Sequence, residues 1–423
     1  MPRIIKNTLL NYVPANFATE GTKSINPARI FEVNNAPIKK GNVVYLCERE
    51  IRAKDNYALQ FAIQKSNEQN SPLKIIHPKI NYEYISKQNY ICNQISQVQK
   101  DFKLLHLDFE ISDEKPCEII KNAEPSVLII DFNPILARNY LKDINCKIYE
   151  IDGHNIIPAR AVSHKQEYCA STLRTKIYHN IFPFLTEFDN KITSKVEADY
   201  VLEDFIKNKL QHYSELKNNS GENVLSGLSK YLNLGFISAQ KVAIEVIKSN
   251  VSNENKEVFL EELIVRKELA DNFCLYAKNF KDFSSIPAWA KISLESHKYD
   301  LRTYLYSPAE LERAKTHDKL WNATQIQLLK EGTIHGYLRM YWAKKIFEWT
   351  ITPDEALKTA IYLNDKYAYD APSPNGYTGI LWAIAGLHDR AFNNYPVTGK
   401  IRRMTYDSLK KKYNLDNYIN KFS

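Results

Sequence analysis

The stretch HGYLRMYWAKKIFEWT, residues 335–350, places two of the chain's five tryptophans seven positions apart. An α-helix turns by about 100° per residue, so every third or fourth side chain falls on the same face. One face of such a helix would consist of His335, Arg339, Trp342, Ile346 and Trp349. Taken alone, this spacing favours an amphipathic helix that buries two aromatic side chains, and a contact to a cofactor is the alternative.

Three other segments combine polar side chains with helix signals. In ELIVRKELADNF, Glu262 precedes Arg266 by four residues, which is the spacing of an ion pair along a helix. In LSGLSKYLNLGFIS, Ser226 and Ser229 lie before a predicted helix, where hydroxyl groups cap the helix or leave its N–H groups to an anion. Asn364 in AIYLNDKYAYD either ends a helix or presents its amide to a ligand. Spacing alone leaves these alternatives open.

The elements that position these residues differ between the two halves of the chain. From about residue 29 to 160, short runs rich in Val and Ile alternate with polar segments of helix length. The predicted strands are NVVYLC, PLKIIHP, FKLLHLDFE and SVLIIDFNP, and DNYALQFAIQKS is a predicted helix. Continuous apolar runs are typical of parallel strands that are buried on both faces. No GxGxxG or Walker A motif follows them, so neither common nucleotide fingerprint is present.

From about residue 196 onward, the sequence predicts a series of amphipathic helices without a repeat period. The segments are EADYVLEDFIKNKL, ISAQKVAIEVIKS, EVFLEELIVRKELADNFCLYAKNF, ATQIQLLKEGTIHGYLRMYWAKKIFEWT and PDEALKTAIYLND. We therefore predict an N-terminal α/β domain with a Rossmann-like parallel sheet at 29–160, followed by an all-α domain at 196–423. An N-terminal extension at 1–28 and a connector at 161–195 complete the predicted organisation.

The 423 residues are 44% hydrophobic and 25% charged, which is typical of a globular protein of two or three domains. No apolar run is long enough to span a membrane and the N-terminus has no secretory core, so a cytoplasmic location is expected. The six cysteines are far apart and lack metal-ligand spacing, so we expect reduced, structural thiols and no metal site. The net charge of +8 permits nucleic acid as a partner, and the basic segment GKIRRMTYDSLKKKY is either a solvated surface or a phosphate contact.

Six blocks in this order resemble the photolyase and cryptochrome flavoproteins, and specifically the class II cyclobutane pyrimidine dimer (CPD) photolyases. The blocks are ARIFEVNNAPIKKGNVVYLCEREIRAKDNYALQFA, DGHNIIPARAVSHKQEYCASTLRTKI, NVLSGLSKYLNLGFIS, ELIVRKELADNF, WNATQIQLLKEGTIHGYLRMYWAKKIFEWT and AIYLNDKYAYDAPSPNGYTGILWAIAGLHDRAF. The resemblance implies an α/β domain followed by a helical FAD domain. It also implies light-driven repair of CPDs in double-stranded DNA, by electron transfer from FADH⁻ to a dimer flipped out of the duplex.

Residues that match the family's motifs receive roles from the resemblance. Those implied to bind FAD are Tyr213, Leu225, Ser226, Gly227, Leu228, Ser229, Arg339, Asn364 and Asp370. Glu262 would donate a hydrogen bond to a thymine carbonyl, as a carboxyl held protonated by burial, and Asn364 would face the flavin N5. Met340 and Trp382 would pack against the flipped dimer. Trp342, Trp321 and Trp349 would relay electrons from the surface to the flavin.

Lys217 and Arg390 are the implied DNA contacts. Relatives commonly have Arg at the position of Lys217, so this chain keeps the positive charge but loses the bidentate geometry. The resemblance also allows a deazaflavin antenna in the α/β domain. It implies a monomer in the cytoplasm, associated with the nucleoid if the organism is prokaryotic.

Two other functions use many of the same residues. A cryptochrome-like photoreceptor would need the flavin and the tryptophans, but the recognisable fold runs almost to Ser423 and leaves no long signalling extension. A nucleic-acid-binding protein without photochemistry would not need Glu262, Asn364 or the three tryptophans. We therefore expect a repair enzyme, with the photoreceptor as the alternative.

Overall fold

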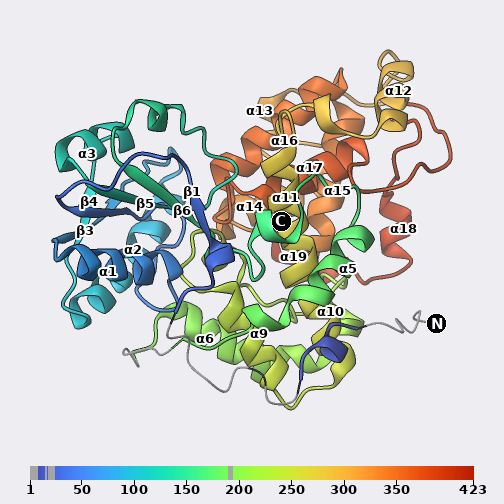
Figure 1. Cartoon of the computed structure of the whole chain (residues 1–423). Coiled ribbons are helices and arrows are strands. Elements are labelled where there is room, and N and C mark those ends of the chain that lie inside the picture. The colour runs from blue at the N-terminus through green and yellow to red at the C-terminus, as the bar shows by residue number, and fades with distance from the viewer. Residues whose placement is uncertain (1–7, 15–16, 18–23, 189–193) are drawn as a thin grey trace.

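The computed structural model describes residues 8–14, 17, 24–188 and 194–423. The predicted N-terminal extension (1–28) and connector (161–195) therefore lie partly outside the described residues. Figure 1 shows an α/β part beside a larger helical part, which confirms the predicted fold class. The exact domain boundaries stay predictions.

The α/β part is built on a six-stranded sheet in the order β1-β6-β5-β2-β3-β4. Its strands are β1 (Ile30–Glu32), β2 (Val43–Leu46), β3 (Leu73–Pro78), β4 (Phe109–Ser112), β5 (Val127–Asp131) and β6 (Lys147–Ile151). β1 pairs with β6 in antiparallel fashion, and all other neighbours are parallel. β2, β5 and β6 are buried along their whole length. Burial on both faces explains the continuous apolar or aromatic sequence of β2 and of residues 127–130, whereas β6 also contains Lys147 and Glu150, which form ion pairs.

Helices cover both faces of this sheet. α1 (Tyr57–Gln69) and α2 (Ile85–Leu104) pack on one face, and α3 (Pro116–Ala123) packs on the other. The predicted strand FKLLHLDFE is wrong, because α2 continues to Leu104 and β4 begins only at Phe109. Phe102 is buried under the last turn of α2 while Lys103 and Leu104 are exposed, so the apolar run belongs to the end of an amphipathic helix.

The rest of the chain is helical. Its α-helices are α4 (Ala159–Val162), α5 (Ala170–Asn180), α6 (Glu197–Asp204), α7 (Tyr213–Leu216), α8 (Ser229–Asn233), α9 (Ala239–Lys248), α10 (Asn253–Leu260), α11 (Lys267–Tyr276), α12 (Ala288–Ser296), α13 (Pro308–Glu312), α14 (Lys319–Glu331), α15 (Gly336–Trp349), α16 (Pro353–Tyr367), α17 (Pro374–Ala385), α18 (Tyr406–Lys410) and α19 (Asp416–Lys421). Two π-helical turns are η5 (Phe205–Lys209) and η7 (Glu261–Arg266). The short 3₁₀ turns are η1 (Leu9–Tyr12), η2 (Pro27–Arg29), η3 (Asn139–Asp143), η4 (Phe182–Phe184), η6 (Leu210–His212) and η8 (Phe283–Ser285).

The predicted segment at 323–350 contains a break. Gly332 ends α14 with a φ of +64°, a left-handed conformation that glycine adopts without steric cost, and α15 begins after it. A Cβ at this position would also clash with the Tyr369 ring, so the turn needs glycine for two reasons. Within the described ranges, no helix has the length and apolar character needed to cross a membrane.

The two parts meet where the strand order reverses, at the carboxyl ends of β2 and β5. Asp131, the last residue of β5, accepts hydrogen bonds from the N–H groups of Glu48, Arg49 and Glu50 over 2.8–3.0 Å. The Arg49 guanidinium in turn pairs with Asp271 of α11 over 2.8 Å, and both side chains are buried. In doubly wound sheets this crevice is the usual place of a ligand. Here it holds α11, which joins the helical part to the sheet.

Candidate flavin and lesion site

The three predicted relay tryptophans form one contiguous buried group. The Trp342 indole N–H donates to Gln325 Oε1 over 2.9 Å, and the Trp321 indole N–H donates to the Trp342 carbonyl over 3.0 Å. The ring centroids of Trp321 and Trp349 are 5.7 Å apart. The predicted burial of Trp342 and Trp349 in a helix is confirmed, but the buried face is wider than the predicted stripe, because Tyr341 and Lys344 are also buried.

The ion pair expected between Glu262 and Arg266 does not form. Both residues lie in the π-turn η7, in which each N–H reaches back five residues, and there Arg266 pairs with Glu261 at 3.3 Å. Glu262 instead accepts a hydrogen bond from the Lys217 ammonium at 2.8 Å. Its side chain is 47% exposed, so the burial that the resemblance implied for this carboxyl is wrong in the free protein.

Lys217 brings Glu262 next to the predicted FAD-binding residue Tyr213. Tyr213 begins α7 and is buried against the rings of Phe205 and Phe259. Burial raises the pKa of the Tyr213 phenol, and the nearby Glu262 carboxylate raises this pKa further. The structure therefore places Tyr213, Lys217 and Glu262 in one cluster.

The serine segment has a different local structure from the one expected. Gly227 has a φ of +67°, and the Ser226 hydroxyl accepts the Leu228 N–H at 3.3 Å. Leu228, rather than a serine, is the N-cap of α8, and no side chain caps that end. Leu228 is buried, Leu225 and Ser226 are partly buried, and Ser229 is exposed. The exposed Gly227 and Ser229 stay candidates for an anion contact.

Arg339 and Asp370, both predicted to lie near the isoalloxazine ring, contact each other. The two guanidinium NH groups of Arg339 donate to the two oxygens of Asp370 over 3.2 and 3.1 Å. The pair is partly buried, and its bidentate geometry fixes the plane of the guanidinium. A fixed cation of this kind can face an anionic ring.

Asn364 lies in the last turn of α16, which continues to Tyr367, so Asn364 is not the residue that ends the helix. Its side chain is buried, and Nδ2 donates to Asp365 Oδ1 over 3.0 Å. Asp365 Oδ2 accepts the Tyr377 hydroxyl at 2.8 Å, so this carboxylate holds the amide from one side. A Cβ at Gly376 would come within 2.9 Å of Asn364 Nδ2, so the glycine leaves room beside the amide.

Met340 and Trp382, the predicted lesion contacts, lie on the packed helices α15 and α17. Met340 Cε borders Gly379 of α17, where a Cβ would lie 3.6 Å away. One turn further along α15, the Lys344 ammonium lies 5.0 Å from the Trp382 ring centroid and donates to the Ala383 carbonyl over 2.9 Å. Burial lowers the pKa of Lys344 from 10.5 to about 7; Asp389 opposes this change and Arg402 adds to it.

His335 and Arg390 contrast in their surroundings. His335 is the N-cap of α15 and is 7% exposed, and both ring nitrogens lack a hydrogen-bond partner among the described residues. Burial lowers the pKa of its imidazole to about 4. Arg390 is exposed, with its guanidinium 5.4 Å from the Phe392 ring centroid. An exposed cation beside an aromatic ring is compatible with its predicted contact to DNA.

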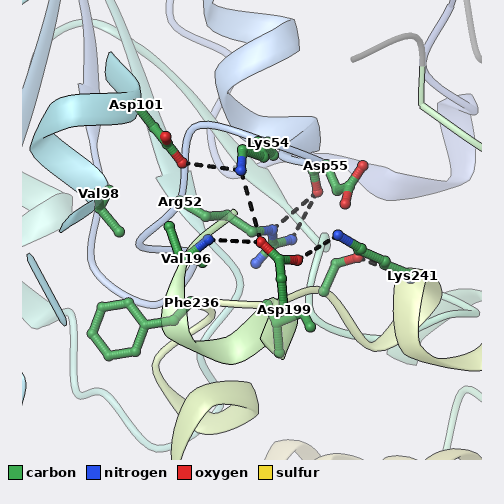
Figure 2. A pocket seen from close by; sticks show the side chains of 11 residues that line it. Arg52, Lys54, Asp55, Val98, Asp101, Val196, Asp199, Phe236 and Lys241 are labelled. Atoms are coloured by element: carbon green, nitrogen blue, oxygen red, sulfur yellow. Dashed lines mark hydrogen bonds and ion pairs between the residues drawn. The ribbon is translucent and has the colours of Figure 1, made fainter. Parts of the chain in front are cut away.

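Two cavities lie at the carboxyl edge of the sheet and away from these residues. Figure 2 shows the first, a small pocket between the loop after β2, α2, and the segments that begin α6 and α9. Its charges are paired, since Asp199 contacts Lys241 and lies 3.8 Å from Lys54. The second is also small and is bordered mostly by apolar side chains, with His77, Tyr82 and Ile91 among them. Among the described residues, no group of His, Cys, Asp and Glu is arranged to hold a metal ion.

Comparison with known proteins decides the family. The chain is 35% identical to the deoxyribodipyrimidine photo-lyase of Arabidopsis thaliana, over 94% of this chain and 93% of the plant protein. This chain belongs to the deoxyribodipyrimidine photo-lyase family. The photolyase of Potorous tridactylus is also 35% identical, over 90% of this chain and 81% of its own length. That of Methanothermobacter thermautotrophicus is 30% identical, over 94% of this chain and 98% of its own length.

The structural comparison supports the photolyase fold. A class III photolyase from Agrobacterium tumefaciens superimposes with a TM-score of 0.67 at 16% identity, over 92% of this chain and 88% of that one. No protein-family model matches the chain. The resemblance to the photolyase family is thus confirmed, whereas membership of class II stays a prediction.

Sequence reasoning missed several residues that contact the predicted site residues. Gln325 accepts the Trp342 indole N–H, Asp365 holds Asn364, and Lys344 lies against Trp382. Asp365 and Lys344 could have been found from the sequence, because they are close to the predicted residues Asn364 and Met340. The sequence contains no comparable sign for Gln325, because its partner Trp342 lies on a different helix.

Replacing Lys344 tests its burial. The pKa of Lys344 is about 7 in the folded protein and 10.5 in the unfolded chain. Its contribution to stability is therefore most favourable above pH 10.5, and this contribution is lost as the pH falls through about 7. Relative to Lys344→Met, the wild-type free energy of unfolding should therefore rise between these pH values, with a slope approaching about 1.4 kcal/mol per pH unit. Denaturant unfolding at several pH values measures this pH dependence of the free energy of unfolding. The exposed Lys358→Met is the control, and a pH-independent difference for Lys344→Met would contradict the burial effect.

Proposed function

We propose that this protein is a photolyase of the class II type that repairs cyclobutane pyrimidine dimers in double-stranded DNA with light. The observation that carries the proposal is the match, over nearly the full length of both chains, to proteins named deoxyribodipyrimidine photo-lyase at 30–35% identity. The geometry supports it, because residues with matching motif positions form an ion pair, a buried amide and a buried tryptophan group in one helical part.

The residues present fit FAD as the cofactor. Gly376 leaves space beside the Asn364 amide, and the buried His335 ring offers two nitrogens without partners in the described protein. Arg339 would favour the negative charge of the reduced flavin, while Asp370 fixes its orientation. When bound, reduced FAD would supply the electron that splits the dimer and receive it back. For a deazaflavin antenna, we propose the carboxyl edge of the sheet, where parallel sheets commonly bind ligands.

Met340 and Trp382 would form the apolar contact to a dimer that has left the duplex. Glu262 would hydrogen-bond a base carbonyl where negative charge develops. Its present partner, Lys217, is also a proposed DNA contact. Transfer of Lys217 to a DNA phosphate would break its contact with Glu262 and leave the Glu262 side chain free to face the base carbonyl.

The proposed partner is duplex DNA, held through phosphates by Lys217 and Arg390, so binding should weaken with salt. We propose that the enzyme acts as a monomer in the cytoplasm. A cryptochrome-like photoreceptor would use the same tryptophans and flavin, and differs from a photolyase in lacking light-dependent repair.

A repair assay on duplexes with a single CPD or a single (6-4) lesion tests the proposal. Wild-type protein should restore the CPD duplex under blue light and leave the (6-4) lesion unchanged. In Glu262→Gln, the quantum yield should fall by about threefold to tenfold, because the amide donates a hydrogen bond but supplies no proton. FAD content should stay the same and DNA affinity should change little.

Glu261→Gln is the matched control on the same π-turn, since Glu261 pairs with Arg174 and Arg266 and has no proposed role in repair. Its quantum yield should equal that of the wild type. Bound flavin without any light-dependent CPD repair would refute the photolyase proposal in favour of the photoreceptor. A wild-type yield in Glu262→Gln would reduce Glu262 to a partly exposed ion-pair partner of Lys217, an interaction worth about 0–1 kcal/mol.

Replacing Trp342 separates the proposed electron relay from repair. Trp342→Phe should block light-driven reduction of oxidised FAD, because the tryptophans charge the flavin but do not enter the repair cycle. Repair by chemically reduced Trp342→Phe should stay near wild type. Absorption spectra during illumination measure the reduction, with Trp289→Phe on α12 as the control outside the buried group. Normal photoreduction in Trp342→Phe would remove this residue from the relay.

A further inference from the structure

The first turn of α2 joins the α/β part to the end of α16. Tyr84, the N-cap of α2, donates its hydroxyl to the Leu329 carbonyl, and its ring centroid lies 4.7 Å from that of Tyr367. Two turns along the helix, the Tyr90 ring stacks on Tyr369 at 4.8 Å. Lys87 lies between these two tyrosines, and a spacing of three residues places all of them on one side of α2.

Lys87 is completely buried, and its ammonium donates to the Asp365 carbonyl over 2.7 Å. Asp365 lies in the last turn of α16, where backbone carbonyls have no partner within the helix and carry partial negative charge. The ammonium also lies 4.5 Å from the Tyr82 ring centroid. Lys87 thus supplies the donor and the positive charge that this helix end requires.

The same helix end contains Asn364, and the chain leads from it to Asp370. We propose that Lys87 is a positioning residue of the proposed flavin site, which holds the last turn of α16 under Asn364 and adds a positive charge that favours reduced over oxidised flavin. The proposal rests on the proposed function for the identity of the bound group. Lys87 belongs to α2, so through this residue the α/β part would influence a flavin bound in the helical part.

Charge at this position depends on pH. Burial lowers the pKa of Lys87 to about 8, while Asp365 and Asp370 oppose this change. The other groups around the ammonium are the Tyr82 ring, Arg339 on Asp370, and Tyr377 and Lys281 near Asp365. Lys87 should therefore be charged at pH 7 and become neutral as the pH rises above about 8. Its effect on the flavin should disappear over the same range.

The test measures the flavin midpoint potential of the FAD-loaded protein from about pH 6.5 to 9.5, together with thermal stability. At pH 7, Lys87→Met should have a lower potential than the wild type, and the difference should shrink above the Lys87 pKa of about 8. Lys87→Arg stays charged throughout, so at high pH its potential should exceed that of the wild type. Lys103→Met, an exposed position on the same helix, should match the wild type at every pH.

A purely structural role for Lys87 would lower thermal stability without changing the potential, and this outcome overturns the proposal. If Lys87→Met does not fold, the comparison of Lys87→Arg with the wild type at high pH is sufficient to test the proposal. Equal flavin potentials in these two proteins at high pH would overturn the proposal. Wild-type protein that binds no flavin overturns the proposed function and this inference together. Flavin binding with unchanged potentials in the Lys87 variants overturns only the role of Lys87.

Discussion

The Arg49–Asp271 ion pair joins the sheet to the helical part, with both side chains almost fully buried. Charges in such a place are costly unless each is paired and hydrogen-bonded. Asp131 holds Arg49 in place for this pair, because it accepts hydrogen bonds from the backbone N–H groups of residues 48–50. Together these contacts fix α11, and α11 packs on α17, which in turn packs on α15 and α16. The helices that contain the candidate site are therefore positioned from the end of the sheet.

Several residues that are predicted to contact ligands already form hydrogen bonds or ion pairs within the protein. Lys217 binds Glu262, Arg339 binds Asp370, and Lys344 binds the Ala383 carbonyl. Such pairing keeps each charge satisfied before any ligand arrives. If Lys217 contacts DNA as proposed, the phosphate would compete with Glu262 for its ammonium, and the affinity would be lowered by the cost of breaking that pair. The bidentate Arg339–Asp370 pair can remain intact when an isoalloxazine ring approaches, so binding the ring does not require this ion pair to break.

The fold class could be predicted because buried parallel strands have continuous apolar sequences, as in Val127–Asp131. The predicted strand at 102–110 failed because the apolar end of a helix looks the same over so few residues. Several predicted site residues do lie together, as Arg339 with Asp370 shows. The spacing of Glu262 and Arg266 left an ion pair open as one alternative, and that alternative is excluded because a spacing rule for α-helices does not apply in a π-turn. Lys87 could not be found, because its importance depends on a contact between residues 278 positions apart.

The π-turn at Glu261–Arg266 also limits how the chain length can change there. It accommodates one more residue per turn than an α-helix, and Lys267 donates its N–H to the Glu262 carbonyl across that wider loop. Deleting a single residue would let the segment close into an ordinary α-helical turn, and because the wide turn holds one extra residue, α10 and α11 would keep nearly the same relative orientation. The contacts of the two flanking helices could then persist, but the side chains within the turn would change direction, and Glu262 would lose its contact to Lys217. The extra residue in this segment therefore determines where Glu262 points, while the helices on either side depend on it little.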